Sequence, residues 1–373
     1  MIKRRCIICL LVAISVFFVF VQNKSYAVEK KYSYTEMVYQ KNDDPFIDKT
    51  SIKNTIDSYF KSRFEYQNGL STKNYTLDLL EKNSSFYKNV EMEDNYNREI
   101  NLLSEEKIQK IIYNNIISKI DKKNGEWIAF VEFKVNFNYD NSENLDSIIE
   151  EKHILHLKKN NGEYYISADI FDEERDLKQV NDEYEKSKVL YEKNVNENNE
   201  VKKIAIENFI NNEREKKYEN YNMIQTRSYN TYNRNGARNW ALYYCHKTPW
   251  DYDADCTNFV SKAMCYGGHM KTDNVWYYHS NAWIRVIELR DWLINNNYAE
   301  EMDNYKYAMV GDIIQYLNKS NVWRHSVIVT TRTNSYPYVK VTAHSRNRRN
   351  VNVSGIYYPK GEFKSYRVLH ITR

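Results

Sequence analysis

The stretch Asp255-Cys256-Thr257-Asn258-Phe259-Val260-Ser261 decides how the C-terminal part of this chain folds. An acidic residue precedes a cysteine, apolar side chains follow at helical spacing, and the run ends at Gly267-Gly268. This pattern predicts a helix with Asp255 as its N-cap, Cys256 in its first turn and glycines at its end. The unpaired N–H groups and the positive dipole end of a first helical turn favour a thiolate. Cys256 is therefore a candidate nucleophile.

A nucleophilic cysteine needs a base, and His325 opens the strand-like run 325–330. A second strand-like run, 338–344, ends in His344. Two adjacent antiparallel strands could place the two histidines side by side, so that His344 would bond the far nitrogen of His325 and orient it. Asn347 is the alternative orienting residue. A helix-borne cysteine followed by a strand-borne histidine is typical of the papain-like arrangement.

Hydrophobic periodicity around these residues predicts an α+β domain at 226–373, with helices first and an antiparallel sheet after them. The predicted helices are 232–244, the helix of Cys256 and 283–293; the predicted strands are 312–317, 325–330, 338–344 and 366–371.

A smaller α+β domain with a cone-like topology is predicted at 28–174, joined to the first by a helical connector at 175–225. Residues 51–66 have apolar side chains at helical spacing, and less regular helical material follows to about 119. Strands are expected at 127–135, 152–157 and 164–168, with Asn160-Asn161-Gly162 as a hairpin turn between the last two.

The first 27 residues have the features of a secretory signal peptide. A basic start (Met1-Ile2-Lys3-Arg4-Arg5) precedes an apolar run at 6–21 and a small-x-small site, Ser25-Tyr26-Ala27. We expect cleavage after Ala27, a secreted or cell-wall-associated protein, and no membrane span thereafter. An uncleaved anchor is the alternative, although the run is short for a span of about 20 residues.

The overall charge gives no support for a nucleic-acid partner, because 54 basic and 50 acidic residues leave a net charge of only +4 in 373 residues. Three cysteines follow the signal segment, at 245, 256 and 265. Either Cys245 pairs with Cys265 and leaves Cys256 free, or all three are isolated thiols.

No metal or cofactor is predicted. Residues 251–262 begin like a calcium loop, but Cys256 stands where glycine is needed and Lys262 where glutamate is needed. A zinc set could be drawn from nearby cysteines and histidines, yet it has no tight Cys-x-x-Cys pair. Its members would be Cys245, His246, Cys256, Cys265 and His269.

Five motifs lie along the C-terminal part of the chain: Tyr232-Asn233-Arg234, the Cys256 run with Gly267-Gly268, Gly311-Asp312, the run 325–329 and His344-Ser345. Together they resemble the "putative amidase domain" family of secreted Gram-positive proteins. That family looks like a branch of the papain-like cell-wall amidases and endopeptidases, which include the CHAP-type enzymes. The resemblance covers roughly 226–373. It implies a papain-like fold, an amide substrate such as a peptidoglycan stem peptide, Cys256 as nucleophile, His325 as general base and then acid, and His344 as orienting residue. Lys262 replaces the glutamine usual in the family.

Candidate substrate-binding residues are Asp255, Tyr252 and Arg346. Tyr252 or Asn239 could be a second oxyanion donor beside the backbone N–H of Cys256. Arg346 belongs to a basic group with Arg348 and Arg349, which is either a solvated loop or a contact for a substrate carboxylate.

The alternative function is a secreted envelope-binding protein whose papain-like domain has no turnover. Acyl transfer by the same residues is a further possibility. Nothing in the sequence indicates an oligomeric state.

Overall fold

The computed structural model describes residues 29–31, 36–37, 48–140, 145–171, 176–188, 207, 210–211, 214–215, 232–318, 320–345, 347–353 and 363–373. The predicted signal peptide and most of the predicted connector lie outside these ranges. Within the described ranges, no helix is both long enough and apolar enough to cross a membrane.

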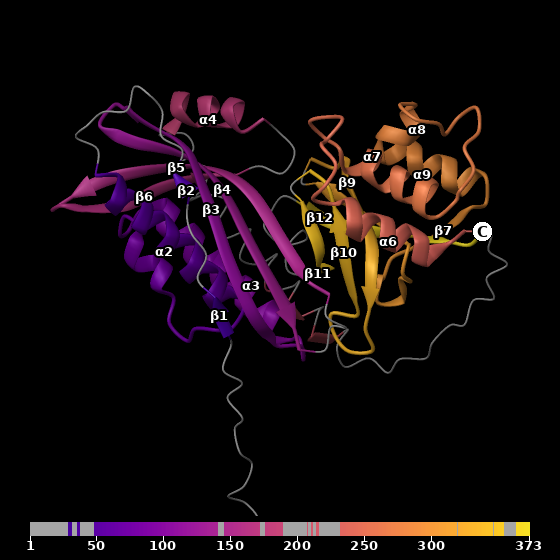
Figure 1. Ribbon diagram of the computed structural model, residues 1–373, viewed down its shortest axis with the longest axis horizontal. Helices are drawn as coiled ribbons and strands as arrows, with labels where there is room; N and C mark the ends of the chain where they lie inside the picture. The colour runs from indigo at the N-terminus through magenta and orange to yellow at the C-terminus, as the bar shows by residue number, and fades with distance from the viewer. Residues whose placement is uncertain are drawn as a thin grey trace, which may run out of the picture.

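The N-terminal half consists of helices packed on a strongly curved antiparallel sheet (Figure 1). Its helices are α2 (Lys49–Gln67), the short η1 (Tyr75–Leu79), α3 (Ser85–Leu102) and α4 (Leu177–Lys186). Its long strands are β3 (Ile108–Lys123), β4 (Glu126–Tyr139), β5 (Ser147–Asn160) and β6 (Glu163–Ile170). Two short strands, β1 (Glu29–Lys31) and β2 (Glu36–Met37), pair with β3 in parallel.

Alternation along β4 explains the packing of this half. Every second residue from Trp127 to Tyr139 is buried, and Phe133 stacks on Phe60 of α2 with ring centroids 4.7 Å apart. The other face of the sheet carries a small apolar cluster, including Ile128 and Ile154, that is covered by α4. Helices therefore cover both faces of the antiparallel sheet, which is the α+β arrangement that the sequence predicted.

The helical character expected up to residue 119 was wrong from Ile108 onward. Residues 108–123 form β3, which pairs with β4 along nearly its whole length. The buried positions Ile111, Tyr113 and Ile117 follow the two-residue period of a strand. Register shifts between Ile108 and Lys110 and between Ile117 and Lys119 interrupt the period on either side of this run and obscure it in the sequence.

The C-terminal half places its helices before its strands, as predicted. The helices are α6 (Arg234–Tyr244), α7 (Cys256–Lys262), a π-helical continuation η2 (Ala263–Gly267), α8 (Asn281–Ile284) and α9 (Val286–Asn295). After β7 (Ala299–Met302) and the 3-10 turn η3 (Tyr305–Tyr307) come β8 (Ile313–Asn318), β9 (Trp323–Arg332), β10 (Val339–Ala343), β11 (Arg348–Asn352) and β12 (Phe363–Ile371).

Two details of this half differ from the prediction. The single helix expected at 283–293 is divided at Arg285, whose φ of -115° and ψ of 140° are extended. The strands β7 and β11 were not predicted. Both are short, and β11 is rich in polar residues, so neither has the apolar alternation that marks β8 or β9.

One sheet runs through both halves, because β11 pairs antiparallel with β5 through Arg348↔Ile149 and Arg349↔Ile148 (Figure 1). The strand order along the sheet is β1-β3-β4-β5-β11-β10-β9-β8-β12-β7. Buried ion pairs cross the junction, with Lys340 Nζ 2.9 Å from Glu106 Oε1 and Arg348 Nη2 2.6 Å from Glu151 Oε1. The largest apolar core also contains residues of both halves.

Candidate functional site

Cys256 is the first residue of α7, as the sequence predicted, and its side chain is buried. Its Sγ lies 3.8 Å from the carbonyl oxygen of Arg324, so the peptide bond between Arg324 and His325 contacts the sulfur. The next residue, Thr257, shares a 3.1 Å hydrogen bond with Ser326 of β9. The start of α7 is therefore fixed against the start of β9.

Asp255 occupies the N-cap position, but its carboxylate does not cap the helix, which corrects the predicted side-chain cap. Oδ2 accepts a hydrogen bond from His344 Nδ1 at 2.7 Å, and Oδ1 accepts from Asn258 Nδ2 at 2.7 Å and from the Asp251 N–H at 3.2 Å. A charge-assisted bond to a histidine is stronger than a bond to a neutral backbone N–H. The carboxylate is therefore directed toward β10 and away from the helix start.

His344 uses both of its ring nitrogens on the α7 side of the sheet. Nδ1 bonds Asp255, Nε2 lies 3.1 Å from the carbonyl oxygen of Cys245, and the ring stacks on Phe259 at 4.1 Å. The carbonyl oxygen of Cys245 can only accept, so Nε2 is the donor in that hydrogen bond. The expected hydrogen bond from His344 to His325 was wrong, because both nitrogens are already used.

His325 lies on β9, where its ring packs 6.3 Å from the ring of Tyr316 and 5.9 Å from that of Phe363. Strand alternation directs it away from the side taken by Ser326, which faces α7. Burial, assisted by the positive charge of Arg348, lowers the pKa of His325 to about 3, so its imidazole is neutral at pH 7. The catalytic pairing of His325 with Cys256 stays a prediction.

The remaining predicted site residues have different surroundings. Asn347 donates to Glu150 Oε2 at 2.9 Å and accepts from Trp250 Nε1 at 3.0 Å, so it links β5 to the loop before α7. Tyr252 is half-buried, and its hydroxyl bonds Nδ1 of His279. Arg346 lies outside the described residues.

The predicted solvated loop is wrong for two members of the basic group, Arg348 and Arg349. Arg348 is fully buried and pairs with Glu151, and the side chain of Arg349 donates to the carbonyl oxygen of Leu242 at 2.8 Å. A buried arginine is stable only with such partners. These two arginines connect the halves and are not arranged for an acidic substrate.

All three described cysteines are free thiols, so the isolated-thiol alternative holds and a Cys245–Cys265 disulfide is absent from this structure. Cys245 is fully buried, and burial raises the pKa of its thiol well above its ordinary value. Cys265 is half-buried, and burial also raises its pKa.

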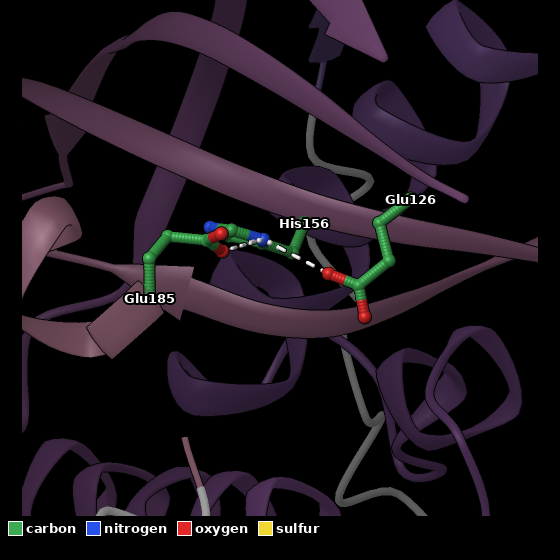
Figure 2. A group of neighbouring side chains, drawn as sticks. All are labelled: Glu126, His156 and Glu185. Carbon is green, nitrogen blue, oxygen red and sulfur yellow. Dashed lines mark hydrogen bonds and ion pairs between the residues drawn. The ribbon is translucent and has the colours of Figure 1, made fainter. Parts of the chain in front are cut away.

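One group of possible metal ligands lies elsewhere, between α4 and the sheet of the N-terminal half (Figure 2). Nδ1 of His156 is 3.2 Å from Glu126 Oε2 and 3.5 Å from Glu185 Oε1. The ammonium of Lys188 lies 2.6 Å from the first of these oxygens and 3.1 Å from the second. The Lys188 ammonium therefore pairs with both carboxylates and is the cation of this cluster. Among the residues that the structure describes, no such group contains a cysteine.

Comparison with known proteins finds one family match, and it lies within the C-terminal half. Residues 231–367 match a family model described as "Putative amidase domain", which indicates a hydrolase acting on C–N bonds. A segment of 110 residues is 33% identical to the "Uncharacterized protein YjcM" of Bacillus subtilis (strain 168). That segment covers 26% of this chain and 26% of the relative, so the chain spans about a quarter of the relative's length. No solved structure is significantly similar.

Proposed function

We propose that the C-terminal half is a secreted cysteine amidase that hydrolyses an amide bond in the peptide part of the cell wall. The observation that carries the proposal is the placement of Cys256 in the first turn of α7, directly after the buried Asp255–His344 pair. The family match supports C–N bond hydrolysis, and the predicted signal peptide supports a substrate outside the cell.

The surroundings of the two histidines support different roles for them. Both ring nitrogens of His344 are occupied, by Asp255 and by the carbonyl oxygen of Cys245, so neither is directed at the thiol. His325 follows Cys256 in the chain at the head of a strand, as the base does in the papain-like arrangement. We assign His325 as proton acceptor from this order, which requires its ring to leave Tyr316 and Phe363 and turn toward Cys256, and His344 as a positioning residue that holds Asp255 and the start of α7.

The reaction then has two stages. The Cys256 thiolate attacks the carbonyl carbon, and the backbone N–H of Cys256 is a candidate donor to the oxyanion. His325 gives its proton to the leaving amine, and a thioester remains. A water molecule, deprotonated by His325, then hydrolyses the thioester and releases the acid.

One observation favours the alternative, a secreted envelope-binding protein without turnover. Only 4% of Cys256 is exposed, and the His325 ring packs on Tyr316 and Phe363. In that case the papain-like half would bind cell-wall peptide without cleaving it.

The test is incubation of the secreted form, residues 28–373, with purified peptidoglycan, followed by mass spectrometry of released fragments and new amines. We expect cleavage by the unaltered protein, none by Cys256→Ala, and normal cleavage by the matched control Cys265→Ala. Binding without cleavage by all three forms would support the envelope-binding alternative.

A further inference from the structure

A partly open cavity of about 200 Å³ lies in the N-terminal half, between α2, α3 and the concave face of the sheet. Six phenylalanines line it, together with a set of amide and charged side chains from both helices and from β5 and β6. The phenylalanines are Phe60, Phe64, Phe86, Phe133, Phe137 and Phe171. For comparison, an apolar cavity of about 150 Å³ holds a benzene molecule. The space therefore suits one small molecule.

Asn97 of α3 lines this cavity with only 2% of its surface exposed. Neither Nδ2 nor Oδ1 of its amide has a hydrogen-bond partner within the part of the chain that the structure describes. Oδ1 of Asn352, which lines the same cavity and is 7% exposed, also has none. Buried amide groups are nearly always satisfied, because leaving them without partners costs stability. These atoms form a donor and two acceptors available to a ligand.

The charged groups of the cavity, in contrast, are satisfied by each other. Arg63 donates to Asp94 at 2.8 Å and to Glu93 at 2.9 Å. His153 contacts Asp169 at 2.7 Å and Glu151 at 3.3 Å. This network contains four carboxylates, and Arg348 is a further partner of one of them, Glu151. Every positive group in it therefore already has a carboxylate partner, and none is available to bind an anionic ligand. An anionic group at this end is therefore disfavoured, and a neutral amide is the group that matches the donor and acceptor of Asn97.

We propose that this cavity binds a small neutral molecule with a primary carboxamide on an aromatic or apolar body. A carboxamide matches the amide of Asn97, giving one hydrogen bond in each direction, and its second N–H can donate to Oδ1 of Asn352. The body of the molecule packs among the phenylalanine rings, as in other sites where a few polar groups orient an apolar ligand. This site is separate from the proposed amidase and does not depend on it.

The probe is benzamide, compared with benzoate, which has a negative charge in place of the amide, and with toluene, which has neither. Binding to the secreted form is measured by calorimetry and by saturation-transfer NMR. We expect saturable binding of benzamide and at least tenfold weaker binding of both analogues.

The decisive variant is Asn97→Leu, which keeps the size of the side chain and removes the amide. We expect benzamide binding to weaken at least tenfold and the melting temperature to rise, because two buried polar atoms without partners are removed. Asn95→Leu, the same change at an exposed position on the same helix, is the control and leaves binding unchanged.

Three results would overturn the proposal. They are no saturable benzamide binding, equal binding by the Asn97→Leu protein, or a lower melting temperature for that protein, which would mean that the amide already has structural partners. Peptidoglycan cleavage by Asn97→Leu is measured in parallel, so failure of this site and failure of the amidase proposal are distinguished.

Discussion

Asp255 and His344 are 89 residues apart in the chain, yet Oδ2 of the one lies 2.7 Å from Nδ1 of the other in a fully buried contact. The pair joins the residue immediately before Cys256 to the residue immediately after β10. The position of the candidate nucleophile therefore depends on a buried hydrogen bond to the sheet as well as on α7 itself.

Asp255→Asn replaces the carboxylate that bonds Nδ1 of His344. Leaving a buried polar group without its partner costs about 1–3 kcal/mol. We expect a loss of that order in the free energy of unfolding, measured with urea, together with loss of peptidoglycan cleavage. The double variant Asp255→Asn/His344→Gln should recover much of the stability and none of the activity. If activity returns with stability, the pair has only a structural role.

The depressed pKa of His325 predicts a loss of stability in mild acid. The pKa is about 3 in the folded protein against 6.5 for an unperturbed histidine, so the unfolded chain binds the proton more readily. The contribution of His325 to the free energy of unfolding is constant above about pH 6.5. As the pH falls from there toward 3, that free energy decreases by about 1.4 kcal/mol per pH unit. Between pH 7 and pH 5, His325 alone should cost about 2 kcal/mol.

The comparison that isolates this effect is His325→Gln, which cannot be charged. Urea unfolding of both proteins at pH 7, 6 and 5 should show the unaltered protein losing stability faster than the variant. Parallel curves would mean that the ring is reached by solvent, and that its packing against Tyr316 and Phe363 does not protect it.

The buried pair between Lys340 and Glu106 should be worth far more than an exposed pair. Their side chains are 1% and 2% exposed and connect β10 to the N-terminal half. Lys340→Met should reduce the free energy of unfolding by about 3–5 kcal/mol, since Glu106 is left buried and charged. The control is Lys73→Met, which breaks a pair with Asp78 whose side chains are 61% and 58% exposed, and which should cost less than about 1 kcal/mol. Similar losses for both variants would contradict the burial argument.

The three thiols should differ in their reaction with iodoacetamide at pH 7.5. Burial raises the pKa values of Cys245 and Cys265, so both are poor thiolates in the native state. If Cys256 is the nucleophile, mass spectrometry should find it labelled first, and labelling should stop cleavage. Labelling of Cys265 ahead of Cys256 would count against an activated thiolate at the start of α7.

Local patterns were enough to predict α2, α6, α7 and the strands β4, β8 and β9, because apolar spacing and helix signals lie within each segment. They were not enough for β11, a short polar strand, nor for its pairing with β5, which is about 200 residues away in sequence. The Asp255–His344 bond was missed for the same reason. Cys256 and its helix could be predicted, but the partners of each histidine depend on which strands become neighbours.

The ladder between β5 and β11 has a consequence for anyone who wishes to cut this protein in two. If the C-terminal half is expressed alone, β11 becomes an unprotected strand edge, and Arg348 loses the carboxylate that neutralises it. Exposed edges of this kind pair readily with other copies and lead to aggregation. Truncation at the boundary between the halves should therefore yield an insoluble fragment, even though the whole family match lies within it.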